Sequence, residues 1–290
     1  MSRIYVVLCA LAIAALLLGS CDDGGGGDSD AGLDGGVDAP VTLNGAVNKG
    51  PFVTGSTVNV APVGETGNPS GEVYPTQTLN DLGEFSVDFT YQGYVSLEGQ
   101  GFYYNEVVGD LSGANLTLRA FYEVATGGTQ SAHINIITHL SYNRVKNLIT
   151  GGTAFADAIA QAEAELKAAL AICPPDFDPA ASGTEMVITG GDSDANAYLL
   201  AVSAVITQAA VLRGAGAVDA NLQEIVNTYA SDLEADGALN DDKVSEIAAA
   251  KLALDPDGVE SMLAGRLSDI GSDATVPDMG RVLDQDGDGA

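Results

Sequence analysis

The sequence predicts an α+β multidomain protein, with an N-terminal antiparallel β-sandwich of about seven strands followed by an all-α helical bundle domain. Three observations lead to this prediction. Residues 41–125 hold short runs rich in Val, Thr, Tyr and Phe that turn residues interrupt at roughly ten-residue intervals. Residues 126–271 instead carry apolar side chains at helical spacing. Acidic, glycine-rich stretches lie on both sides of these regions.

The chain begins with an apolar leader over residues 1–20. Arg3 precedes an uncharged run over 4–18, which matches a signal-peptide core but is short for a membrane span of about 20 residues. The end of this leader, Leu18-Gly19-Ser20-Cys21, resembles the lipobox of bacterial lipoproteins. The resemblance implies cleavage before Cys21, lipid attachment to its thiol, and therefore a membrane as partner. The alternative is an ordinary secreted protein that keeps Cys21 as a free thiol.

A disordered tether is predicted over residues 21–40. Residues 22–40 hold seven glycines and six aspartates, a composition that cannot form a core. Asp22 and Asp23 resemble an inner-membrane retention signal in some Gram-negative lineages and a surface-export signal in others. The expected location is the cell envelope, lipid-anchored at the outer membrane and facing outward, with a periplasm-facing position as the alternative.

Seven strands are predicted in the β-sandwich domain, over residues 41–125. In the fourth, Phe85, Val87 and Phe89 alternate with Ser86 and Asp88, which is the period of a half-buried strand. The seven runs cover residues 41–47, 57–63, 73–79, 84–90, 94–98, 103–108 and 115–122.

The turns between these runs carry a family resemblance. The segments 55–60, 79–85 and 101–102 resemble the carboxypeptidase regulatory-like (transthyretin-like) β-sandwich, in which a Thr-Asp-x-x-Gly-x-Phe turn precedes a later Gly-Tyr pair. Leu79 and Phe102 depart from that pattern. The resemblance implies a non-catalytic spacer or ligand platform.

Helices are predicted throughout the helical domain, over residues 126–271. Apolar residues form one stripe over 137–149 and a second over 155–170. The segment 196–213 is apolar nearly all round, and its place between amphipathic helices favours a central buried helix over a membrane span. Expected N-caps of the other helices are Thr153, Asp219, Asn240 and Asp255, and Gly237 is expected to end one of them.

The order of features also resembles a set of uncharacterised predicted bacterial surface lipoproteins. The segments 49–58, 134–149 and 232–241 carry this resemblance, which extends over nearly the whole mature chain. This resemblance implies only the architecture of the protein and its location in the cell.

Composition limits the partners and the cross-links. The chain has 40 acidic and 11 basic residues and a formal net charge of −29, which excludes nucleic acid as a partner. Of the three cysteines, Cys9 lies in the leader and Cys21 is the expected lipid site. Only Cys173 is then left, so no intramolecular disulfide is expected.

No catalytic constellation stands out, so the chain is predicted not to be an enzyme. His133 and His139 are the only histidines, and a zinc site needs three or four ligands at suitable spacing. Ser141 lies beside His139 but lacks the Gly-x-Ser-x-Gly turn that exposes a nucleophile.

Two segments are candidate binding sites. Phe102, Tyr103 and Tyr104 are the densest aromatic cluster, either packed in the sandwich or forming an exposed platform for a glycan or protein ligand. If they lie on a strand, Tyr103 faces away from the other two. Asp284, Asp286 and Asp288, followed by Gly289, resemble the first half of a calcium loop. They lie in a predicted acidic flexible tail, residues 272–290, whose affinity for calcium alone is expected to be weak.

These observations predict a lipid-anchored cell-envelope protein with a non-catalytic binding or adhesion role. A periplasm-facing scaffold is one alternative. A hydrolase with a site at the interdomain junction is another, and it predicts a convergent acid or histidine pocket with a perturbed pKa at that junction.

Overall fold

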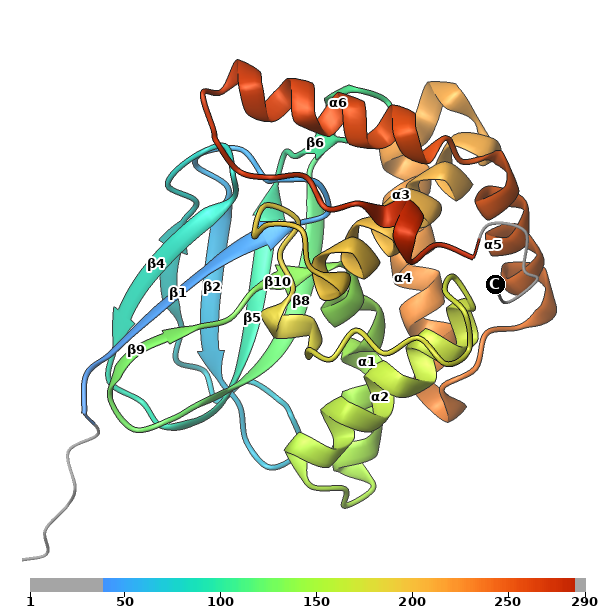
Figure 1. Ribbon diagram of the computed structural model, residues 1–290. Helices are drawn as coiled ribbons and strands as arrows, with labels where there is room; N and C mark the ends of the chain where they lie inside the picture. The colour runs from blue at the N-terminus through green and yellow to red at the C-terminus, as the bar shows by residue number, and fades with distance from the viewer. Residues whose placement is uncertain (1–38, 285–290) are drawn as a thin grey trace, which may run out of the picture. The chain divides into compact units, whose positions relative to one another are not determined.

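The computed structural model describes residues 39–284. The predicted signal peptide, Cys21 and nearly all of the tether lie outside the described residues. Sheets fill the N-terminal half and six helices the C-terminal half, which confirms an α+β protein (Figure 1). The strands are β1 (Val41–Asn48), β2 (Thr57–Pro62), β3 (Tyr74–Gln77), β4 (Glu84–Phe89), β5 (Gly93–Gly101), β6 (Tyr104–Asn105), β7 (Asp110–Leu111), β8 (Leu116–Val124), β9 (Gly128–Ser131) and β10 (Ile134–Asn135).

The strands form two four-stranded sheets and a small hairpin. One sheet is ordered β10-β1-β4, with β9 also paired to β1, and the other is ordered β3-β2-β5-β8. β1 runs parallel to β9 and β10 and antiparallel to β4. Each of the seven predicted runs contains a strand. β7, β9 and β10 were not predicted because each is only two to four residues long, too short to show a period.

The helices follow in the order that the sequence predicts, and three short 3₁₀ turns lie between or after them. They are α1 (Ile136–Thr150), α2 (Phe155–Leu170), α3 (Asp194–Arg213), α4 (Val218–Asp236), α5 (Asp241–Ala253) and α6 (Pro256–Asp269), with η1 (Gly183–Glu185), η2 (Ala215–Ala217) and η3 (Met279–Arg281).

Side-chain caps begin several of these helices. Asn135 closes a capping box at the start of α1, while Asn240 and Asp255 cap α5 and α6 as predicted. The predicted cap Thr153 is wrong, because α2 begins after Ala154 without a side-chain hydrogen bond.

The predicted cap Asp219 is also wrong. It lies within the first turn of α4, whose N-cap residue is Ala217. The Asp219 carboxylate instead accepts hydrogen bonds from the Tyr103 hydroxyl at 2.9 Å and from the Gly113 N–H at 2.7 Å. Gly237 does end α4, in the left-handed conformation that glycine adopts without strain (φ 75°).

α3 is buried on every side. Among residues 39–284 it is the one helix long and apolar enough to cross a membrane, and 78% of that apolar window lies inside the structure. Its alanines let neighbouring helices approach closely, and its buried Ser203 contacts the loop between β1 and β2. The prediction of a central buried helix therefore agrees with the structure.

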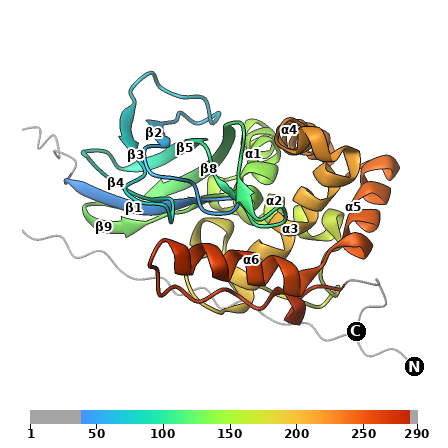
Figure 2. The same cartoon turned by 90° about the horizontal axis from the view of Figure 1, so that it is seen from above.

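The boundary predicted after residue 125 does not separate two bodies. β9 and β10 come after it, and one continuous apolar core runs from the strands into the helices. Figures 1 and 2 show α6 lying along both parts. Its Met262 carbonyl accepts from the Tyr104 hydroxyl at 3.0 Å, and its Arg266 pairs with Asp81 at 2.8 Å.

Residues 272–284 differ from the predicted flexible tail. Met279 and Val282 are buried in the main core, and the Asp284 N–H donates to the carbonyl of Ile172 at 2.9 Å. The segment is held because its apolar residues find places against the helices. Residues 285–290 lie outside the described residues.

Candidate functional site

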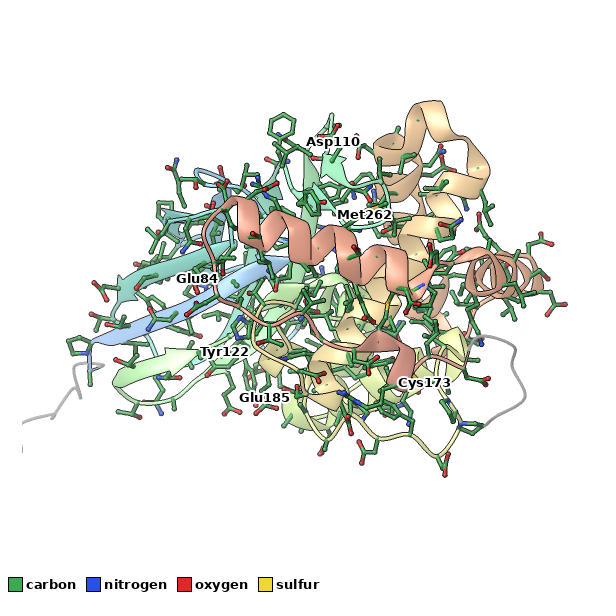
Figure 3. All side chains as sticks on the ribbon, turned by 45° about the horizontal axis from the view of Figure 1, so that its top comes forward. Glu84, Asp110, Tyr122, Cys173, Glu185 and Met262 are labelled. Carbon is green, nitrogen blue, oxygen red and sulfur yellow. The ribbon has the colours of Figure 1, made fainter. Side chains whose placement is uncertain are left out.

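A cavity of about 660 Å³, the junction cavity, opens between β8, α2 and the irregular segment over residues 171–193. Figure 3 shows Tyr122 of β8 and Glu185 of that segment on the same side of the molecule. The two are close enough that Glu185, after burial, raises the pKa of the Tyr122 hydroxyl. The lining includes the aromatic residues Tyr94, Phe121, Tyr122, Phe177 and Tyr198 and the charged residues Glu123, Glu163, Lys167, Asp176 and Asp178.

One face of α2 forms a wall of the cavity. Ala156, Ala160 and Ala164 recur every four residues, and Glu163 and Lys167 lie on the same stripe. Because alanine side chains are short, this face leaves space that larger residues would fill. The irregular segment covers part of the face that Glu163 and Lys167 occupy.

The irregular segment forms the facing wall and is held by hydrogen bonds. The Asn135 amide donates to the carbonyls of Gly183 at 2.7 Å and of Met186 at 3.0 Å. Ser182 and Glu185 close a capping box around η1. The wall is therefore in place before any ligand arrives, which reduces the free-energy cost of ordering on binding.

Glu163 joins the two walls. Both of its carboxylate oxygens accept from the Gly183 N–H, at 3.0 and 3.1 Å. A Cβ atom at Gly183 would lie 2.8 Å from Glu163 Oε1, so a larger residue there would displace the carboxylate from this position. Burial raises the pKa of Glu163 to about 7; the Gly183 N–H opposes this rise and the negative charge of Glu185 adds to it. A carboxyl that titrates near neutral pH in a cavity is a functional-site candidate.

Tyr198 of α3 contributes a second polar group to the lining. The residue is 3% exposed, and its hydroxyl has no hydrogen-bond partner among the described residues. Its ring lies 5.9 Å from the ring of Phe177, centroid to centroid. A buried hydroxyl without a partner costs about 1–3 kcal/mol, so Tyr198 marks a place where the folded chain leaves a polar group unsatisfied.

Of the two alternatives for the aromatic cluster, packing holds for the two tyrosines and exposure for Phe102 alone. Phe102 is 46% exposed, while Tyr103 and Tyr104 are buried at 1% and 8%. β5 ends at Gly101 and β6 begins at Tyr104, so the strand alternation expected across these three residues is broken. The two tyrosines instead join the strands to the helices through the hydrogen bonds to Asp219 and to α6.

The two histidines do not share a site. His133 Nδ1 accepts from the Ala46 N–H at 3.0 Å. His139 is buried on α1, and neither ring nitrogen makes a hydrogen bond within the described chain; the Asn227 amide faces the ring without reaching hydrogen-bond geometry. Ser141 donates to the carbonyl of Ile137 in its own helix, so it is not arranged as a nucleophile.

Metal-ligating groups are not gathered in the described part of the chain. Between residues 39 and 284, no three His, Cys, Asp or Glu side chains lie close enough together to hold a metal ion. Of the predicted calcium ligands, Asp284 is buried, at 6% exposure. Asp286 and Asp288 lie outside the described residues, as does the predicted lipid site Cys21.

Comparison of the chain with protein-family models, curated proteins and solved structures finds no match. The residues that line the junction cavity were not predicted from the sequence. The one readable signal of the cavity is the repeat of alanines at positions 156, 160 and 164 beside Glu163, but the same pattern also occurs on exposed helix faces.

Proposed function

We propose that this chain is a lipid-anchored envelope protein that captures a small amphipathic ligand in the junction cavity without transforming it. Lipid on Cys21 would hold it at the outer membrane, with the folded part facing outward. The lipobox resemblance supports the anchor, and the charge of −29 suits a soluble domain held beside a membrane.

The junction cavity is the observation that carries the binding role. Small-molecule sites are typically clefts of about 300–1,000 Å³ with mostly apolar and aromatic walls and a few placed polar groups. The cavity has about 660 Å³, five aromatic residues in its lining and the Glu163 carboxyl between its walls. An apolar body would pack against the rings, and a polar head would reach Glu163.

The finer description of the fold belongs to the same proposal. The two four-stranded sheets would be the faces of a β-sandwich of the carboxypeptidase regulatory-like kind, and the helices a bundle packed beside it. In support, the Asn80-Asp81-Leu82-Gly83 turn leads into β4, and the Asn80 side chain accepts from the N–H groups of Leu82 and Glu84. Such a sandwich would act as the platform on which β8 presents its side of the cavity.

Fluorescence titration of the full-length chain with the neutral apolar probe N-phenyl-1-naphthylamine tests the binding role. Ala160 and Ala164 are exposed lining residues, so Ala160→Trp should fill the cavity without disturbing the core. Ala168→Trp is the matched control, because it lies on the same helix, is exposed and is not part of the lining. We expect saturable binding that falls about tenfold or more in Ala160→Trp and stays unchanged in the control. Equal binding by both variants, or none by the parent chain, would overturn the proposal.

A hydrolase is the second candidate, because the Glu163 carboxyl with a pKa of about 7 matches the acid expected at the junction. Glu163 would then act as general base toward a water. The lining contains no histidine or cysteine, so no second catalytic group of those kinds assists it. Turnover of nitrophenyl esters that Glu163→Gln abolishes would favour this candidate over simple capture.

A further inference from the structure

The charges around the junction cavity are of one sign. Four carboxylates belong to its lining: Glu123, Glu163, Asp176 and Asp178. Lys167 is the single basic residue there, and its ammonium group donates to the backbone carbonyl of Phe177. The basic group is therefore engaged by the chain itself, and the lining has excess negative charge.

The same walls carry aromatic faces. Tyr94, Phe121 and Tyr122 approach from the strands, and Phe177 and Tyr198 from the helical half. The Phe121 ring is held by stacking on Tyr142 at a centroid distance of 4.2 Å. Aromatic faces attract ammonium groups within about 6 Å of the ring centroid.

Tyr198 adds a polar group without a partner in the described chain to the same lining. Its hydroxyl oxygen is an acceptor with no partner among residues 39–284, although the residue lines the cavity and is 97% buried. An ammonium N–H group within hydrogen-bond reach of that oxygen would satisfy it.

The buried carboxyl strengthens the attraction for a cation. Burial raises the pKa of Glu163, so the ionised form is poorly solvated and gains most from a positive charge beside it. Two opposite charges at contact distance attract more strongly in a protein site than in water, because the effective dielectric there is lower. An anionic head group would instead meet four carboxylates.

We infer that the ligand of the junction cavity is an organic cation: a primary ammonium group carried on an apolar body. This inference rests on the proposed binding function of the same cavity. The apolar body occupies the space beside the alanine stripe of α2, and the ammonium group lies between Glu163 and the aromatic rings.

Three probes with one apolar body and different head groups test the inference: hexylammonium, hexanol and hexanoate. Each displaces N-phenyl-1-naphthylamine from the full-length chain at pH 7.5 and low salt. We expect hexylammonium to bind about tenfold tighter than hexanol and hexanoate to bind weakest, with the preference shrinking as salt is added. Glu163→Gln should lower the affinity for hexylammonium about tenfold more than that for hexanol. Glu72→Gln, an exposed carboxyl outside the cavity, is the matched control.

The outcomes separate the two proposals. If the neutral probe binds and Ala160→Trp blocks it, but hexylammonium competes no better than hexanol, the cation inference is wrong and the binding function stands. If hexanoate competes best, the inference is likewise wrong. If the neutral probe does not bind, both proposals fail. A hexylammonium preference that Glu72→Gln reduces as much as Glu163→Gln would reflect overall charge, which also contradicts the inference.

Discussion

Removing one partner of the Lys49–Glu106 ion pair should destabilise the chain more than removing both. The Lys49 ammonium lies 2.8 and 2.9 Å from the two carboxylate oxygens of Glu106, and both side chains are 0% exposed. The Ser203 hydroxyl of α3 lies 2.7 Å from Glu106 Oε1 and also contacts the Lys49 carbonyl. The ring of Tyr103 lies 5.4 Å from the ammonium nitrogen. The pair therefore joins the strands to the central helix in a fully buried site.

The size of the expected change in the free energy of unfolding follows from this burial. Burial lowers the pKa of Lys49, and the Glu106 carboxylate opposes that effect. Lys49→Met leaves a buried carboxylate with only the Ser203 hydroxyl, and we expect a loss of about 3–5 kcal/mol in the free energy of unfolding. The double variant Lys49→Met/Glu106→Leu removes both charges, while Ser203 keeps the Lys49 carbonyl as acceptor. It should unfold within about 1 kcal/mol of the parent chain, or be more stable.

Urea unfolding of the full-length chain, followed by circular dichroism, measures these differences. The matched control is the exposed pair Arg119–Glu98, whose side chains are 45% and 37% exposed. Arg119→Met should cost less than about 1 kcal/mol. The reasoning is refuted if Lys49→Met lowers the free energy of unfolding no more than Arg119→Met does. It is also refuted if the double variant is less stable than Lys49→Met.

Three other predictions concern single residues. Tyr198→Phe removes a buried hydroxyl that has no partner in the described chain, so it should raise the free energy of unfolding by about 1 kcal/mol and Tm by about 2–4 °C; a lower Tm in calorimetry would contradict this. Burial, with a smaller contribution from the charge of Arg119, lowers the pKa of His139 to about 4 from an ordinary 6.5. On acidification the unfolded chain therefore takes the proton first, and about 3 kcal/mol of stability is lost between pH 6.5 and 4. Urea titrations at several pH values should show that His139→Gln flattens this loss, and an unchanged profile would show that His139 is not its source. Cys21→Ala should move the protein from the membrane to the soluble fraction on cell fractionation, and a variant that stays in the membrane would argue against the lipid anchor.

Most of the secondary structure was readable in the sequence. The alternation in β4, the apolar stripe of α1 and the caps Asn240 and Asp255 are local signals, and each marked the element that formed. The misses have equally local causes. Thr153 and Asp219 are residue types that favour N-caps. The N-cap of α2 is instead Ala154, one residue after Thr153, and the N-cap of α4 is Ala217, two residues before Asp219.

The candidate site was not readable, because its parts are distant in the sequence. Tyr122, Glu163 and Tyr198 come from a strand and two helices, and only folding brings them to one cavity. In the sequence, Glu163 is placed among the apolar residues of its helix as any exposed carboxylate would be. The pKa of Glu163 depends on burial by the segment over residues 171–193. No periodicity or motif in that segment predicts where it lies in the fold.

The aromatic cluster over residues 102–104 shows the same difference between what the sequence shows and what the tertiary structure decides. Its composition was evident, but whether a ring is exposed depends on what packs over it. α6 and α4 cover Tyr104 and Tyr103 and supply the acceptors for their hydroxyls, which leaves Phe102 alone at the surface.

The sequence by itself therefore determined the order and kind of the elements, the buried character of α3 and the acidic surface, since periodicity, capping and charge act over a few residues. Only the tertiary structure decided that strands and helices share one core, that Lys49 meets Glu106 and that a cavity forms beside α2. These depend on contacts between residues far apart in the chain, and the burial that such contacts create sets both the cost of a charge and the pKa of an acid.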